Sequence, residues 1–432
     1  MYIVWKRRLL LLGIALTVAS FFGIGTMQIS PTLYASQLAL IDKSPHKNIP
    51  YPHLFTRMPI THTNCPSLAR AAVRVPLAEG KRQNLLYTYN TSSNGFLIRY
   101  DIRSGKKTTI LKLTNATISD AQISPDGHFI LFVTQVNSQL AIQMVRVDGQ
   151  SLQTLYCVPH NTEPINFIDD LLWSPDQQQI LFRVPDPTAG KASPLIQLLD
   201  LANGSLRTAL TPSGNIGYIP RAWPITDQVY MQGYALDASD TVPPHDVYVL
   251  NVSKKSIQRV ASITGYDWDF SLTPDGKHLL LGQGAALPPQ GQPQPPSLIS
   301  EQAVAGGKLQ MIYGSHVYAV TQIRAISAKT LLFVLGGRFA SGARNGLWKI
   351  NMDGSGLMQL TSKGKLLSDQ HTLWSDISRD GHMYAVASYN STANDDTGQA
   401  IVLYGSLNGG STTVVDMTDV GNNPEIVGWT TL

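Results

Sequence analysis

The feature that most constrains the fold is a short turn sequence that recurs along the chain. Each copy places an apolar residue, Ser or Thr, a turn-forming pair and often Gly directly before a short apolar run. The interval between copies is about 50 residues, which is typical of repeat units that stack or close into a ring. The copies are ISPDG at 123–127, WSPDQ at 173–177, LTPDG at 272–276 and ISRDG at 377–381, with weaker copies from 222 and from 325.

The segments between the turns also repeat. In one unit, FILFVTQ follows the turn, AIQMVRVDGQ comes next, and LQTLYCV is third, with Gly, Asp or Asn at the joins. Short apolar strands joined by such turns are typical of an antiparallel meander. Only 14% of the residues are charged and 43% are hydrophobic, so the chain can build a large core. The sequence predicts an all-β fold with four strands in each unit.

One four-stranded sheet cannot bury both of its faces, but a ring of such sheets can, and that ring is a β-propeller. Before the first turn, 84–113 contains three strand-like segments without a first strand. At the other end, EIVGWTTL at 425–432 resembles a first strand with nothing after it. We expect the C-terminal strand to complete the N-terminal blade, which leaves no open edge. This closure predicts seven blades over 81–432. A six-bladed ring is the alternative, and it leaves both end segments unexplained.

The recurring turn has a structural explanation. Pro presets φ, Asp accepts from nearby amides, and Gly adopts positive φ. Asp126, Asp176, Asp275 and Asp380 are therefore interpreted as turn residues rather than as metal ligands or acids.

The N-terminus predicts a membrane segment. Lys6, Arg7 and Arg8 precede an uncharged, mostly apolar run from Leu9 to Ile29. That run is long enough to cross a bilayer, and the basic cluster predicts that everything after it lies outside the cytoplasm. The run exceeds a usual signal sequence, which favours a retained helix at 1–30 over a cleaved signal, although TLYAS near Ala35 resembles a cleavage site. With cleavage the protein would be secreted.

Residues 31–80 are rich in Pro, His and Thr and show no sustained period, so they are interpreted as a stalk that drapes over the propeller. The two cysteines, Cys65 and Cys157, would join this stalk to the propeller if they paired in an oxidising compartment. Two separate buried thiols remain the alternative, because spacing alone does not decide between them.

The repeats resemble a known family. LWSPDQQQILF, ISPDGHFILF and LWKINMDGSGLMQLT are similar to the PD40 repeats, related to WD40 repeats, of TolB-type propellers. Such propellers also occur in prolyl-oligopeptidase-like enzymes. The resemblance covers most of 81–432 and implies the fold more than a function. The chain differs from TolB in leaving no room for a separate N-terminal domain, so TolB's partner is not implied. It differs from the peptidases in having no hydrolase segment after the propeller.

Catalytic motifs are missing from the sequence. It contains no G-x-S-x-G, H-E-x-x-H, C-x-x-C or P-loop, and its ten His are scattered. We expect no cofactor and no metal. The best candidates for a site are polar or aromatic residues on the first strand of each unit, which would ring one mouth of the central channel. They are Asp120, Asp170, Arg221, Asp269, Arg324 and Trp374. A solvated rim without binding function is the competing interpretation.

These features favour a membrane-tethered, extracytoplasmic, non-catalytic propeller that binds a protein or another ligand of the cell envelope. We expect a monomer. A nucleic-acid partner is disfavoured, because no basic cluster follows the N-terminal one. The alternative is a propeller enzyme, a polysaccharide lyase or hydrolase acting at the channel mouth. TolB-like repeats occur in oligogalacturonate lyases, which hold a metal with a His/Gln cluster, but no such cluster is found in this sequence.

Overall fold

A computed structural model describes residues 65–432, apart from short gaps. The gaps are 76, 79, 137, 159–166, 187–193, 213–214, 237–244, 264–267, 284–295, 337–345, 362–372, 391–398, 420–421 and 423. The predicted membrane segment and most of the predicted stalk lie outside the described residues. Within them, no helix is long and apolar enough to span a bilayer.

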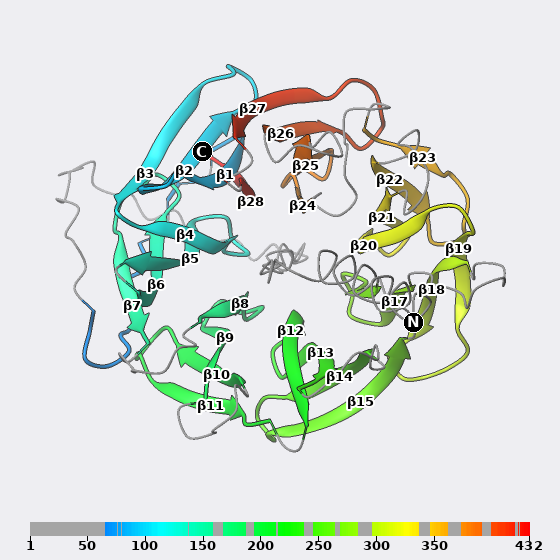
Figure 1. Cartoon of the computed structure of the whole chain (residues 1–432), viewed down its shortest axis with the longest axis horizontal. Coiled ribbons are helices and arrows are strands. Elements are labelled where there is room, and N and C mark those ends of the chain that lie inside the picture. Colours follow the sequence, from blue (N-terminus) through cyan, green and yellow to red (C-terminus); the bar gives the residue numbers. More distant parts are fainter. Residues whose placement is uncertain are drawn as a thin grey trace, which may run out of the picture. The chain divides into compact units, whose positions relative to one another are not determined.

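The described chain forms seven four-stranded antiparallel sheets arranged in a ring, as Figure 1 shows. The first sheet, the closing blade, has the order β28-β1-β2-β3, with β28 at Glu425–Thr431, β1 at Gln83–Asn90, β2 at Asn94–Asp101 and β3 at Lys107–Thr114. The other blades follow in chain order, with their strands in sequence from the inside of the ring to the outside.

The strands of these six blades have the following bounds. The second blade is β4 Thr117–Ile123, β5 Phe129–Val136, β6 Gln139–Arg146 and β7 Gln153–Cys157; the third is β8 Asp169–Trp173, β9 Gln179–Pro185, β10 Pro194–Asp200 and β11 Leu206–Leu210. The fourth is β12 Ile216–Ile225, β13 Gln228–Ala235, β14 His245–Asn251 and β15 Ser256–Ile263; the fifth is β16 Trp268–Leu272, β17 His278–Gln283, β18 Ser297–Ala303 and β19 Gln310–Ser315. The sixth is β20 Ala319–Ser327, β21 Thr330–Gly336, β22 Gly346–Asn351 and β23 Met358–Gln359; the seventh is β24 Leu373–Ile377, β25 Met383–Asn390, β26 Gln399–Ser406 and β27 Thr413–Asp419.

The C-terminal strand closes the ring. β28 pairs antiparallel with β1, from Gln83 opposite Thr431 to Thr88 opposite Glu425. Trp429 and Thr430 on this strand are almost fully buried. The prediction of an all-β propeller with seven blades, closed by the last strand, is confirmed, and the six-bladed alternative is wrong.

The recurring turn has the same hydrogen bonds in four blades. In the third blade, the Ser174 hydroxyl donates to Asp176 at 2.6 Å and accepts from the Gln179 amide at 2.8 Å. The Thr273 hydroxyl donates in the same way to Asp275 at 2.6 Å. The Ser, Thr and Asp side chains thus accept hydrogen bonds from backbone amides of the turn that the β-ladder leaves without a partner. The interpretation of these Asp residues as turn residues agrees with this geometry.

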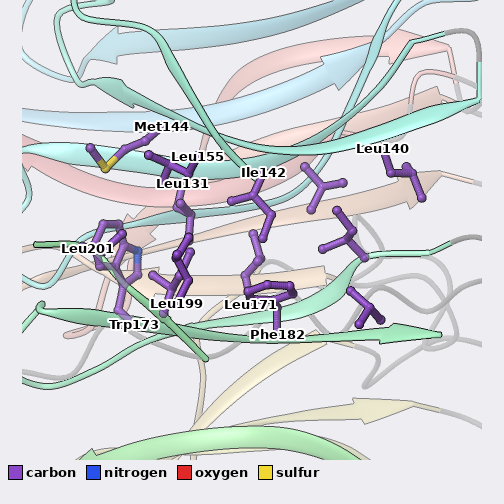
Figure 2. Packing of buried hydrophobic residues seen from close by; sticks show 14 of the residues in the cluster. Leu131, Leu140, Ile142, Met144, Leu155, Leu171, Trp173, Phe182, Leu199 and Leu201 are labelled. Atoms are coloured by element: carbon purple, nitrogen blue, oxygen red, sulfur yellow. The ribbon is translucent and has the colours of Figure 1, made fainter. Parts of the chain in front are cut away.

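The hydrophobic core lies between neighbouring blades rather than inside any one sheet. Figure 2 shows one such layer, in which Leu131 and Ile142 of the second blade face Leu171 and Phe182 of the third. All four side chains are fully buried. Since each sheet buries both faces only against its neighbours, each blade depends on the blades beside it for its stability.

The segment from Cys65 to Gly80, which we call the strap, lies against the second and third blades before it enters the closing blade. Its amides donate to propeller carbonyls, from Arg70 to Leu155 and from Ala72 to Leu201, both at 2.8 Å. Gly80 then donates to Thr431 at 3.2 Å. The described part of the predicted stalk is thus held by hydrogen bonds along the outside and one end of the ring.

A disulfide joins the strap to the propeller. Cys65 and Cys157 are bonded, with their Cα atoms 5.7 Å apart. Cys157 is the last residue of β7, so the bond fixes the start of the strap beside the outer strand of the second blade. Of the two alternatives that the sequence left open, the structure has the paired form.

Candidate functional site

The residues predicted to line the channel mouth all lie on innermost strands. Asp120 is on β4, Asp170 on β8, Arg221 on β12, Asp269 on β16 and Arg324 on β20. Figure 1 places β4, β8, β12 and β20 nearest the centre of the ring. Trp374 belongs to the innermost strand of the seventh blade, but its side chain lies outside what the structure describes.

Two of these carboxylates connect neighbouring blades. The Asp120 carboxylate accepts from the Leu171 amide of the third blade at 2.7 Å, and the Asp269 carboxylate accepts from the Ile323 amide of the sixth blade at 2.8 Å. Leu171 and Ile323 belong to the next blade along the chain. Each carboxylate therefore accepts a hydrogen bond from a backbone amide of the neighbouring sheet. Both residues therefore have a structural role in addition to any role in binding.

Local backbone conformation directs these side chains. The β4–β5 ladder shifts register between Ser119 and Gln122, and the β8–β9 ladder shifts between Asp169 and Leu172. Asp120 and Asp170 lie at these bulges and have positive φ values of 51° and 53°. A bulge re-aims a side chain, and Asp tolerates positive φ better than most residues.

A cluster of charges forms around Arg183 in the third blade; the sequence predicted Asp170 and Arg221 as site residues but not Arg183 or Asp169. Arg183 of β9 donates through Nε and Nη2 to the Asp169 carboxylate at 2.9 and 2.8 Å, and its Nε also contacts Asp170. Its Nη1 donates to the Tyr234 hydroxyl of the fourth blade at 3.3 Å. Arg221 donates to the Gln232 side chain at 2.8 Å. The sequence signals for this cluster are the charged residues that interrupt the apolar pattern, which are Arg183 and the Asp169–Asp170 pair.

Burial sets the protonation of the carboxyls. It raises the pKa of Asp120 well above the usual value, and the nearby charge of Asp170 adds to this effect. Burial likewise raises the pKa of Asp170, although Arg183 and Arg221 act against it. Burial raises the pKa of Glu425, on the closing strand, to about 7, while the Asp120 amide donates to it. The three carboxyls with a raised pKa lie on the inner strands of three adjacent blades, where little water screens one charge from another.

The described side chains form a polar surface at one end of the third and fourth blades. The pairing of Arg183 with Asp169 and Tyr234 is a charged and hydrogen-bonding surface at the start of β8 and the end of β9 and β13. Asp169 and Tyr234 are partly exposed there. Among the described residues, no three His, Cys, Asp or Glu side chains gather in a way that could hold a metal ion.

The two ends of the ring differ in the length of their strand connections. One end, which we call the corner end, carries the recurring turns and the connections from third to fourth strands. Even the longest of these connections, such as 147–152, are short. The other, the loop end, carries the remaining connections, and Asp169 and Tyr234 lie at this end. Its long connections between second and third strands are 186–193, 236–244, 284–296, 337–345 and 391–398.

No protein-family model matches the chain, and no curated protein matches it in sequence. Solved structures do match. The propeller domain of the Trilobed protease from Pyrococcus furiosus is 13% identical with a TM-score of 0.51, and the match covers 80% of this chain and 98% of that one. A prolyl endopeptidase structure is 13% identical with a TM-score of 0.54, covering 83% of this chain and 50% of that one. Putative TolB from Agrobacterium tumefaciens is 17% identical with a TM-score of 0.43, covering 69% and 95%.

At these identities the two matches with TM-scores above 0.5 support the fold and not an activity. The chain is a seven-bladed β-propeller, structurally similar to TolB and to the propeller domains of prolyl-oligopeptidase-type enzymes.

Proposed function

We propose that the protein is a membrane-tethered scaffold outside the cytoplasm that binds a protein or another ligand of the cell envelope, without catalysis of its own. The ligand would bind at the loop end, around the partly exposed side chains of Asp169 and Tyr234. Arg183, which both of them contact, would hold them in position.

The observation that carries this proposal is the difference between the two ends of the ring. Connections at the corner end are short in every blade, whereas those at the loop end are long in five blades. Binding residues in rigid scaffolds are found disproportionately on such connections. The charged cluster of the third blade lies at the same end, and its polar groups would give a ligand orientation and specificity.

The location outside the cytoplasm rests on two further observations. The apolar run from Leu9 to Ile29 follows a basic cluster, which is typical of a membrane anchor with its downstream part exported. The Cys65–Cys157 disulfide supports an oxidising compartment, because cytosolic proteins rarely keep such bonds.

Photocrosslinking from the two ends of one blade tests the proposal. Val317 lies in the connection 316–318 at the loop end of the fifth blade, and Lys308 lies in the connection 304–309 at its corner end; both are exposed. A photoreactive residue at position 317 of the full chain should capture an envelope component in the source cells. The same residue at position 308 is the control and should not. Capture from position 308 alone would contradict the proposal.

A further inference from the structure

The strap carries an apolar stripe that faces away from the propeller. Val73 is 65% exposed and Val75 is 50% exposed, whereas Ala72 and Leu77 pack against hydrophobic clusters of the ring. The strap is fixed at this point by two hydrogen bonds between Val73 and Gln153, at 2.8 and 2.9 Å. The two valines are therefore held at the surface by the fold and are not side chains of a free end.

Basic side chains continue this stripe onto the closing blade. Lys81 and Arg82 are exposed directly before β1, and Arg103 and Lys106 are exposed in the connection between β2 and β3. Asp101 is the carboxylate beside them; it lies 3.8 Å from Arg82 and accepts from the amides of Arg103 and Ser104. Asp148, a second carboxylate near Val75, is paired with Arg146. Among the described residues of this part of the corner end, the exposed basic side chains therefore outnumber the carboxylates.

These residues lie at one end of the ring. Arg146, at the end of β6, donates to the Val75 carbonyl at 3.4 Å, and the Leu77 amide donates to His128 in the recurring turn at 3.2 Å. Both contacts belong to the corner end, as do the connection of Arg103 and the entry into β1. We call Val73, Val75, Lys81, Arg82, Arg103 and Lys106 together the basal surface.

We propose that the basal surface docks on anionic lipid headgroups of the membrane that holds the predicted N-terminal anchor. This inference rests on the proposed function, because it takes the chain to be tethered. Apolar side chains bordered by Lys and Arg are the composition that binds an anionic bilayer surface. The strap is also the described segment closest in sequence to the anchor, and tethering raises the concentration of bilayer near it.

Docking at the corner end would turn the loop end away from the bilayer. The loop end would then be open to ligands of the envelope, while the closing blade and the strap stay at the lipid surface. The disulfide between Cys65 and Cys157 would keep the strap in place under the pull of the linker that precedes it.

The test uses the full chain in nanodiscs that contain phosphatidylglycerol. A nitroxide is attached at Val75→Cys and, as a control, at Met417→Cys on the outer strand of the seventh blade, where Met417 is 59% exposed. The two native cysteines are bonded to each other and do not compete for the label. The label at position 75 should lose its collisions with a water-soluble nickel complex and keep those with oxygen, whereas the label at position 417 should keep both.

Charge reversal gives the second arm. The pair Lys81→Glu and Lys106→Glu should restore nickel access at position 75. The pair Lys112→Glu and Arg259→Glu, at exposed positions within the outer strands β3 and β15 rather than in corner-end connections, changes the net charge equally and should not. Equal release by both pairs would overturn the assignment of this surface.

Failure of the inference and failure of the tether are separable. A chain that enters the nanodiscs but leaves position 75 as accessible to nickel as position 417 overturns the docking surface alone. A chain that does not enter them overturns the proposed tether and the docking together.

Discussion

The Arg379 guanidinium donates to the Pro125 carbonyl at 2.9 Å, although the closing blade lies between the two blades that carry these residues. In the other blades a covalent hairpin joins the first and second strands. In the closing blade, these strands are β28 and β1, from the two ends of the described chain. The hydrogen bond of Arg379 connects the turns of the blades on either side of this break. Thr430 of β28 adds a second connection, because its hydroxyl donates to the Gly127 carbonyl at 2.8 Å.

Replacing Arg379 by Met should therefore destabilise the ring. The variant keeps much of the apolar stem but leaves the Pro125 carbonyl without its charged donor, which costs about 1 to 3 kcal/mol. Denaturant unfolding measures the change. Lys277→Met, at an exposed position in the turn of the fifth blade, is the control and should change stability by less than about 0.5 kcal/mol. Equal effects of the two substitutions would contradict the role of Arg379 in closure.

Asp120 should tolerate amide substitution but not truncation. Its carboxyl accepts from the Leu171 amide, and burial raises its pKa, which disfavours the charged form. Asp120→Asn keeps a neutral acceptor, whereas Asp120→Ala leaves the amide unpaired at a cost of about 1 to 3 kcal/mol. Thermal unfolding of the two variants at neutral pH measures the difference. A lower stability for Asn than for Ala would show that the ionised carboxylate is required.

Glu425 should make the stability of the ring depend on pH. Burial raises its pKa from 4.5 to about 7 in the folded state. The raised pKa means that its stabilising contribution is fully present below the unfolded pKa and is lost as the pH rises through about 7. That loss is on the order of 3 kcal/mol for a shift of this size. The unfolding free energy of the wild type should fall between about pH 4.5 and pH 7.

Glu425→Gln is the matched variant for this prediction. It is neutral at every pH, so it should remove part of the fall and be more stable than the wild type above neutrality. The measurement is denaturant unfolding across the pH range. If both proteins show the same pH slope, Glu425 does not titrate as its burial predicts.

Gly204 should be required for seating the strap. It has a φ of 75°, and a Cβ atom there would lie 2.5 Å from the Ala71 amide nitrogen. Gly306 has a φ of 94°, and a Cβ there would meet nothing within 4 Å. Both Ala variants carry the strain of positive φ, about 1 to 2 kcal/mol, but Gly204→Ala also displaces the strap. Hydrogen exchange of the Arg70 and Ala72 amides should accelerate in Gly204→Ala and stay unchanged in Gly306→Ala. Acceleration in both would contradict the packing role.

The repeat interval and the unmatched strands at the two ends predicted the architecture from sequence, because both depend on local patterns. Ile426, Val427 and Trp429, for example, are apolar residues on both faces of the last strand, as a strand with two buried faces requires. The site was less predictable. Asp120 could be placed on an inner strand, but its bond to Leu171 joins residues of different blades, and no spacing encodes such a contact. Arg183 stood inside an apolar strand and was missed, since its partners come from other strands and from Tyr234 of the next blade.

The central claim is that the last strand closes the ring beside β1, and a designed crosslink tests it most directly. Gln83 and Thr431 are register partners on β1 and β28, and Cα atoms of antiparallel partners lie about 4.5 to 5.5 Å apart, within disulfide range. The double variant Gln83→Cys and Thr431→Cys should form an intramolecular disulfide under mild oxidation, seen by mass spectrometry of linked peptides. The control, Gln83→Cys with Thr412→Cys, should not form one. Free thiols at positions 83 and 431 in the folded, oxidised protein would contradict the closure.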